Sequence, residues 1–222
     1  MTKQVSTLLL VLLSLFLALS CEKEVPLAPA KPGILEMFPN TLGGQWTYHM
    51  VDNLQIIDST KPNITIDTVA ASIDKIIDPS TDTETTVWRY IINNRDIIVR
   101  PVFFSGDTVY IYWNWENRDR IGLVFPFKER DSWRTGGFLS GDETTVLEII
   151  TVRVPAGLFE NVFVLENKTR TIVSTDSKRT ITLWYVPNLG PIKIHLHEEH
   201  LQAVGDTTWT LVDHNFPGFD NK

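Results

Sequence analysis

The chain has 222 residues, of which 43% are hydrophobic and 21% are charged, and its formal net charge at pH 7 is −7. The acidic balance argues against nucleic acid as a partner, because binding to phosphates needs a basic face. The length suffices for one sizeable core, and the apolar content argues against wholesale disorder.

The N-terminus has the pattern of a secretory signal. Lys3 precedes an apolar run from Leu8 to Leu19 that only Ser14 interrupts, and small residues come next. A basic start, a short apolar core and small residues before a cleavage site are typical of a signal peptide. The run is too short to span a bilayer comfortably, since spanning takes about 20 residues. We therefore predict a signal peptide over residues 1–20.

Cys21 is the one cysteine of the chain, and it directly follows this run. A lone cysteine cannot form an intramolecular disulfide. The segment Leu17-Ala18-Leu19-Ser20-Cys21 resembles a lipobox, with Ala18 where leucine is usual. The resemblance implies that the sulfur of Cys21 carries a diacylglycerol and that cleavage occurs just before it. Two acyl chains anchor a protein stably. The alternative is an ordinary cleaved signal with an incidental cysteine.

Cleavage would remove Lys3 and leave 19 basic against 27 acidic residues, a net charge of −8. This charge also argues against electrostatic attraction to anionic lipid. Glu22-Lys23-Glu24 resembles the export tag of surface lipoproteins in Bacteroidota. We expect a bacterial envelope protein, most simply at the outer membrane, on its periplasmic or its surface-exposed side. Three prolines in residues 21–33 predict an extended linker before a globular domain at 34–222.

The globular part is expected to be all-β. Residues 34–38 suggest one helical turn, and no later segment shows sustained helical periodicity. About eleven short strands with turn signals between them predict a single antiparallel β sandwich or half-open barrel. The expected strands cover 45–50, 64–77 with a bend, 85–92, 96–104, 108–115, 121–127, 143–154, 159–173, 179–186, 191–201 and 207–213, and the Gly-rich segment 133–138 is an additional candidate.

Two turn signals and one apolar run refine this expectation. Asn93-Asn94 predicts a two-residue hairpin, and Gly205-Asp206 predicts the turn before the last strand. Residues 162–165 (Val-Phe-Val-Leu) are apolar on both faces of a strand. Such a strand indicates a curved sheet that wraps around its own core, or a second layer.

Three segments resemble a recurrent set in uncharacterised, β-rich lipoproteins of the Bacteroidota type. They are 38–48, which is similar to "FPL..G..W.Y", 154–162, which is similar to "VPAG.F..V", and 184–193, which is similar to "YapGvGlVk". Asn188 stands where glycine is common and Pro191 where an aliphatic residue is usual. Asparagine tolerates the left-handed conformation, so the tight turn survives. The resemblance implies a β-rich fold and an envelope location, and it implies no activity.

Residues 192–200 hold the sharpest cluster of chemical groups. On a strand, His195, His197 and Glu199 share a face because side chains alternate. Two histidines two positions apart can bind zinc, and Glu199 is a third candidate ligand. The helical zinc motif has a different spacing, with two histidines four positions apart. The alternative is a hydrated strand face that covers inward-facing aliphatic residues. No cofactor is otherwise indicated.

A second cluster is aromatic. Tyr110, Tyr112, Trp113 and Trp115 lie close together in the sequence beside Asn114. Aromatic faces next to amides suit the binding of a sugar or an apolar ligand. The alternative is that the tryptophans pack in the core and the tyrosines pair across strands.

The motifs of nucleophilic, phosphate and dinucleotide chemistry are missing from the sequence. We therefore expect a non-catalytic envelope lipoprotein that binds or scaffolds a protein partner, a glycan or a lipid. One alternative is a metal-assisted hydrolase that uses His195, His197 and Glu199. Another is a purely structural subunit of an envelope complex.

Overall fold

The structure is a computed structural model that describes residues 33–56, 61–78, 82–112, 120–134, 142–170, 178–200, 202–216 and 219. The predicted signal peptide, Cys21 and nearly all of the predicted linker lie outside the described residues, as do Trp113 and Trp115. Within the described ranges, no helix is both long enough and apolar enough to cross a membrane.

One short helix precedes the strands. It is α2 (Ile34–Met37), which confirms the predicted helical turn. The strands are β1 (Gln45–Ile56), β2 (Asn63–Ile77), β3 (Glu84–Ile92), β4 (Asp96–Ser105), β5 (Thr108–Tyr112), β6 (Arg120–Val124), β7 (Ser132–Arg134), β8 (Glu143–Val154), β9 (Gly157–Arg170), β10 (Lys178–Val186), β11 (Gly190–His200) and β12 (Ala203–His214).

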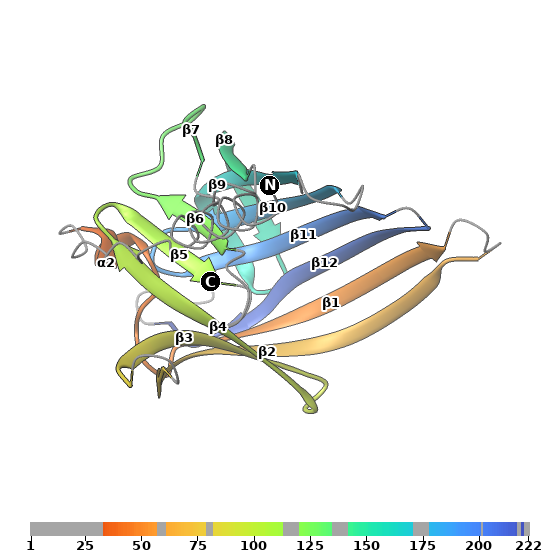
Figure 1. The fold of residues 1–222 in the computed structure, drawn as a ribbon, viewed down its shortest axis with the longest axis horizontal. Coiled ribbons are helices and arrows are strands. Elements are labelled where there is room, and N and C mark those ends of the chain that lie inside the picture. Colours follow the sequence, from red (N-terminus) through yellow and green to blue (C-terminus); the bar gives the residue numbers. More distant parts are fainter. Residues whose placement is uncertain are drawn as a thin grey trace, which may run out of the picture.

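The strands form one antiparallel sheet in the order β6-β5-β4-β3-β2-β1-β12-β11-β10-β9-β8-β7. The sheet curls into a nearly closed barrel with one unsealed seam, so the predicted all-β fold is confirmed as a barrel (Figure 1). Consecutive strands pair throughout, except β6 and β7, and the first and last strands pair with each other. The seam therefore lies in the middle of the chain and not between its ends.

Alternation along each strand separates an inner from an outer face. In β1, Trp46, Tyr48 and Met50 are buried, whereas His49 and Val51, on either side of Met50, are exposed. Because side chains of a strand alternate, the even-numbered residues of β1 line the inside of the barrel. The core also holds Val162 and Leu165 of the run that the sequence marks as apolar on both faces.

Helix α2 and the residue after it close one end of the barrel (Figure 1). Phe38 is fully buried and stacks on Trp88 with ring centroids 5.2 Å apart. The backbone carbonyl of Met37 accepts hydrogen bonds from the Tyr185 hydroxyl and from the Asn188 backbone N–H, both at 3.0 Å. The aromatic core therefore gathers at this end.

The inner face is exposed at the opposite end. Leu54 and Ile56 continue the inner row of β1, yet their side chains are 37% and 50% exposed. Leu54 lies opposite Gly205 of β12, and Ile56 lies opposite Ala203. We call this region the accessible end of the barrel. In Figure 1 it lies at the right, where β1, β2, β11 and β12 extend away from α2.

The structure corrects one predicted turn and confirms another. Gly205 and Asp206 lie inside β12, paired with β1 on one side and with β11 on the other. The turn prediction there is wrong because pairing on both edges overrides the local preference of Gly-Asp for turns. A hairpin forms at Asn93 and Asn94 as predicted, and both residues have positive φ angles, 50° and 57°. Its loop has three residues and not the predicted two, because Ile92 pairs with Asp96.

Candidate functional site

The histidine-rich segment forms β11, and its side chains alternate as the sequence predicts. Ile192 is fully buried, and Ile194 and Leu196 pack against the core. His195, His197 and Glu199 therefore share the outer face. Across the β10–β11 pair, Glu199 lies opposite Lys178.

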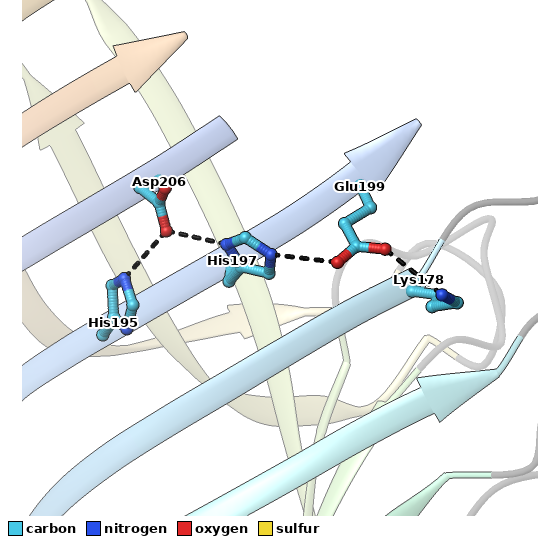
Figure 2. Close-up of polar contacts among 5 residues, drawn as sticks. All are labelled: Lys178, His195, His197, Glu199 and Asp206. Atoms are coloured by element: carbon cyan, nitrogen blue, oxygen red, sulfur yellow. Dashed lines mark hydrogen bonds and ion pairs between the residues drawn. The ribbon is translucent and has the colours of Figure 1, made fainter. Parts of the chain in front are cut away.

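Asp206 of β12 joins the two histidines. It lies opposite His197 in the antiparallel register. Its Oδ1 accepts a hydrogen bond from His197 Nδ1 at 2.8 Å and another from His195 Nε2 at 3.1 Å (Figure 2). One carboxylate oxygen thus holds both rings.

The contacts continue on the other side of His197. Its Nε2 lies 3.5 Å from Glu199 Oε1, and Lys178 Nζ donates to Glu199 Oε2 at 3.3 Å. Figure 2 shows the five side chains as one row over β12, β11 and β10. We call this row, His195–Asp206–His197–Glu199–Lys178, the histidine–carboxylate chain.

The contacts shift the acid–base properties of the chain. The hydrogen bond to Asp206 is the largest influence on the pKa of His197 and raises it. Burial lowers this pKa by less, and the hydrogen bond to Glu199 raises it further. Burial raises the pKa of Asp206, but the hydrogen bonds from His197 and His195 outweigh it, so the net pKa is lowered. The hydrogen bonds from Lys178 and then His197 lower the pKa of Glu199.

These directions agree with the geometry of His197. Both of its ring nitrogens face carboxylate oxygens, and only the protonated imidazolium can donate from both nitrogens at once. The side chains of His197, Asp206 and Glu199 are 34%, 40% and 46% exposed. At this exposure, solvent screens the attraction, so each pair contributes little to stability. The arrangement is a cross-strand network of charges on the outer surface.

The same geometry bears on the zinc hypothesis. Among the residues that the structure describes, no group of three or more His, Cys, Asp or Glu side chains could hold a metal ion. His195 Nε2 and His197 Nδ1 both form hydrogen bonds with Asp206 Oδ1. A zinc ion would have to replace these hydrogen bonds. Zinc binding by His195, His197 and Glu199 stays a prediction that metal analysis would test.

The tyrosines of the aromatic cluster lie on β5, on the opposite face from the core residue Ile111. The Arg120 guanidinium lies 4.6 Å from the ring centroid of Tyr110 and 5.5 Å from that of Tyr112. Its Nη1 also donates to the Tyr112 hydroxyl at 2.8 Å. Tyr110 and Tyr112 are therefore part of an outer-face stack with Arg120. Their role in ligand binding, together with Trp113 and Trp115 outside the described residues, stays a prediction.

Two charged residues on the inner face were not anticipated. Arg100 of β4 is two positions from the core residue Val102, and Arg179 of β10 is two positions from the core residue Ile181. The signal was present in the sequence, because each arginine is in phase with inward-facing aliphatic residues on a predicted strand. The sequence does not indicate Asp206 as part of the site, because the Gly205-Asp206 pair predicts a turn and not a strand.

Comparison with known proteins finds no matching family model and no matching curated protein. Two crystal structures are similar to the chain. A protein of Parabacteroides distasonis ATCC 8503, provisionally named a lipoprotein, is 14% identical with a TM-score of 0.44, over 80% of this chain and 97% of that one. A protein of Bacteroides fragilis NCTC 9343, provisionally named an exported protein with a YmcC-like fold, is 16% identical with a TM-score of 0.38, over 81% and 98% of the two chains.

Proposed function

We propose that the chain is a lipid-anchored envelope protein whose barrel binds a ligand through its accessible end. The observation that carries this proposal is the exposure of Leu54 and Ile56. Leu54 and Ile56 are 37% and 50% exposed, whereas Trp46 and Tyr48 in the same row of β1 are only 2% and 1% exposed. Ligand sites are commonly concave and lined by apolar side chains, and the mouths of β barrels are among their usual places.

The asymmetry of the barrel supports this role. One end is filled by Phe38 and its aromatic neighbours and is covered by α2. The other end leaves aliphatic side chains of the inner face in contact with water. Exposed aliphatic surface costs free energy, and a ligand with an apolar part would remove it from water. The anchor itself rests on the resemblance of residues 17–21 to a lipobox.

The test uses the full chain, produced in a bacterium that acylates lipoproteins and extracted from its membranes in a mild non-ionic detergent. Intact mass spectrometry should show a chain that begins at Cys21 and carries a diacylglycerol. Native mass spectrometry should show a further, non-covalent mass on the same protein. A Cys21→Ala variant that remains in the membrane fraction would overturn the anchor.

Two matched variants test where the ligand binds. Leu54→Arg places a charge on the inner face at the accessible end and should remove the non-covalent mass. Ile66→Arg is the control, because Ile66 lies on the neighbouring strand β2, opposite the outer-face residue Val51, and is 74% exposed. A wild-type protein without bound mass, or a Leu54→Arg protein that keeps it, would contradict ligand binding at this end.

A further inference from the structure

The sheet has a free edge on β2 at the accessible end of the barrel. β2 pairs with β1 from Asn63 to Ser72, but its pairing with β3 begins only at Val69. Among the described residues, none forms a backbone–backbone hydrogen bond with residues 63–67 on the β3 side. Figure 1 shows β1 and β2 continuing past the hairpin of β3 and β4 at this end. We call residues 63–67 the free edge of β2.

Hydrogen bonds along β2 show which backbone groups point out of this edge. The Thr68 carbonyl accepts a hydrogen bond from the Asn93 N–H at 3.0 Å, and the Thr68 N–H donates to Asn93 Oδ1 at 3.2 Å. Thr68 therefore points toward β3. Ile73 exchanges backbone hydrogen bonds with residues 43–44, which lead into β1. Because successive backbone groups of a strand point to opposite sides, even-numbered residues of β2 point toward β3 and odd-numbered residues toward β1.

Ile64 and Ile66 thus present unpaired backbone groups and apolar side chains together. Their N–H and C=O groups point out of the free edge. Their side chains lie on the outer face and are 59% and 74% exposed, and Val51 lies opposite Ile66. Proteins commonly protect a sheet edge with lysine, proline or a bulge, and residues 63–67 contain none of these. Such an edge is suited to pairing with a further strand.

The free edge is self-complementary. Its sequence is Asn-Ile-Thr-Ile-Asp, with Thr65 at the centre. In an antiparallel pair with Thr65 opposite Thr65 of a second copy, Ile64 lies opposite Ile66 of that copy, and the reverse. Each such pair can exchange both of its backbone hydrogen bonds, and the isoleucine side chains meet on the outer face. A register shifted by one residue would lose both kinds of contact.

Both ends of the free edge limit such a pair to residues 63–67. Thr68 already forms hydrogen bonds with Asn93. In the second copy, the residue opposite Thr68 would be Pro62, which has no N–H to donate. Lys61 lies in a bend, so the chain of the second copy turns away before it reaches the β3–β4 hairpin. The length of the unpaired edge therefore matches the length of the strand that would cover it.

We propose that two copies of the chain pair through the free edge of β2, antiparallel and about a two-fold axis at Thr65. A closed two-fold dimer covers the same edge of both copies at once. Interfaces below about 1,200 Å² are typical of weak, transient complexes, and so short an edge belongs to that class. The proposal goes beyond the proposed function, since the pairing requires no ligand.

A disulfide across the two-fold axis tests the pairing. The full-length Thr65→Cys protein is produced in a bacterium that acylates lipoproteins, and its membranes are treated with a mild oxidant. Opposite residues of a non-hydrogen-bonded antiparallel pair have Cα atoms about 4.5 Å apart, which a disulfide can bridge. We expect a reducible dimer on a denaturing gel. The wild type, whose one cysteine is Cys21, gives the background.

Asn63→Cys is the matched control for this variant. Asn63 lies on the same edge and the same face as Thr65, and both side chains are exposed. In the proposed register, however, the two Asn63 Cα atoms of a dimer would be about 14 Å apart, at about 3.4 Å per residue along the strand. A disulfide cannot span this distance. Thr65→Cys should therefore form severalfold more dimer than Asn63→Cys.

A second pair of variants tests the apolar contact. Ile64→Lys, added to Thr65→Cys, places a charge on the edge and should reduce the disulfide dimer severalfold. Ile97→Lys in the same background should leave the dimer unchanged. Ile97 is a fair control because it lies on β4, outside the free edge, and is 59% exposed, as is Ile64. Circular dichroism of each variant confirms that the barrel is folded.

Each contrary outcome overturns a defined part of the proposal. Equal cross-linking of Thr65→Cys and Asn63→Cys would overturn the register, and a Thr65→Cys protein that stays monomeric in the membrane would overturn the dimer. A reducible product whose mass is not twice that of the chain would overturn the second copy in favour of a different protein. All of these outcomes leave ligand binding in the barrel standing, because the test involves no ligand.

Discussion

The indole Nε1 of Trp133 donates a hydrogen bond to the backbone carbonyl of Gly122 at 2.8 Å. Trp133 lies on β7 and Gly122 on β6, which are the two edge strands of the sheet. The Trp133 ring also lies parallel to the ring of Phe127, with centroids 5.9 Å apart and planes at 3°. A side chain thus bridges the seam that backbone pairing leaves unsealed.

Replacing Trp133 by phenylalanine should weaken this bridge. Trp133→Phe keeps an aromatic ring near Phe127 but removes the donor, and we expect the free energy of unfolding to fall by about 1 kcal/mol. The amides of β6 should exchange faster with deuterium than before, because an edge strand with fewer contacts opens more readily. Urea unfolding and hydrogen exchange would measure the two effects.

Trp184→Phe provides the comparison. Trp184 lies on β10, in the middle of the sheet, and its ring is covered by Lys193 Nζ at 4.5 Å from the centroid. This variant should leave exchange in β6 unchanged. A Trp133→Phe protein whose β6 amides exchange as slowly as in the wild type would show that the indole does not hold the seam.

Most of the fold could be predicted from sequence because the inner and outer faces alternate so regularly. Residues 45–50 show the alternation, and the structure buries Trp46, Tyr48 and Met50 accordingly. The extension of β1 to Ile56 could not be predicted in the same way. Beyond Met50, Asp52 and exposed Leu54 continue the inner row, so burial no longer matches a simple apolar pattern. That loss of pattern coincides with the accessible end of the barrel.

The stability of the barrel should depend strongly on Phe38, which fills its closed end. Its ring is fully buried, stacks on Trp88 and meets the rings of Phe104 and Phe125 edge-on at 5.6 and 6.3 Å. Phe38→Ala removes a large side chain that several rigid rings surround, and we expect a loss of about 3–5 kcal/mol in urea unfolding. Leu42→Ala, at a side chain that is 55% exposed, should change stability by less than about 0.5 kcal/mol. Similar losses of stability in both variants would contradict the role of Phe38 in filling the closed end of the barrel.

The turn between β10 and β11 should require glycine at position 190. Gly190 has a φ of +91°, and a Cβ there would lie 3.0 Å from Pro39 Cγ and 3.4 Å from Trp46 Cζ2. Gly190→Ala should therefore destabilise the protein by about 1–3 kcal/mol, through backbone strain and crowding.

Asn188 in the same turn is the control. Its φ is 65°, which confirms the left-handed conformation expected for this asparagine. Asn188→Gly preserves that conformation and should change stability by less than about 1 kcal/mol. Thermal melts of the two variants would decide the matter, and equal melting temperatures for Gly190→Ala and the wild type would contradict the crowding.

The candidate site was only half predictable, and the missing half has a physical cause. The shared face of His195, His197 and Glu199 follows from strand alternation within one segment. The residue that joins the histidines, Asp206, comes from the next strand, and its place depends on the register between β11 and β12. Register is set by pairing partners and by turn geometry. The sequence places the turn at Gly205-Asp206, whereas His200 already pairs with Ala203, so the local pattern does not specify the register.

The histidine–carboxylate chain should make stability depend on pH through His197. Its pKa is raised in the folded protein, so protonation contributes stability that is fully present below the unfolded value of about 6.5. This contribution is lost as the pH rises through the folded pKa. The lowered pKa of Asp206 has the opposite dependence, with a contribution present above its ordinary range and lost in acid. The interaction should therefore be strongest near pH 5–6.

Asp206→Asn removes the charged acceptor and should destabilise the protein by no more than about 1 kcal/mol, because the groups are partly exposed. The difference from the wild type should be larger at pH 5.5 than at pH 8.5. An NMR titration should show the pKa of His197 falling toward its ordinary value in the variant. Asp213→Asn, at the exposed end of the same strand, should change neither the pH dependence of stability nor the pKa of His197. An Asp206→Asn effect that is equal at both pH values, with an unchanged His197 titration, would show that the carboxylate orients the histidines without controlling their protonation.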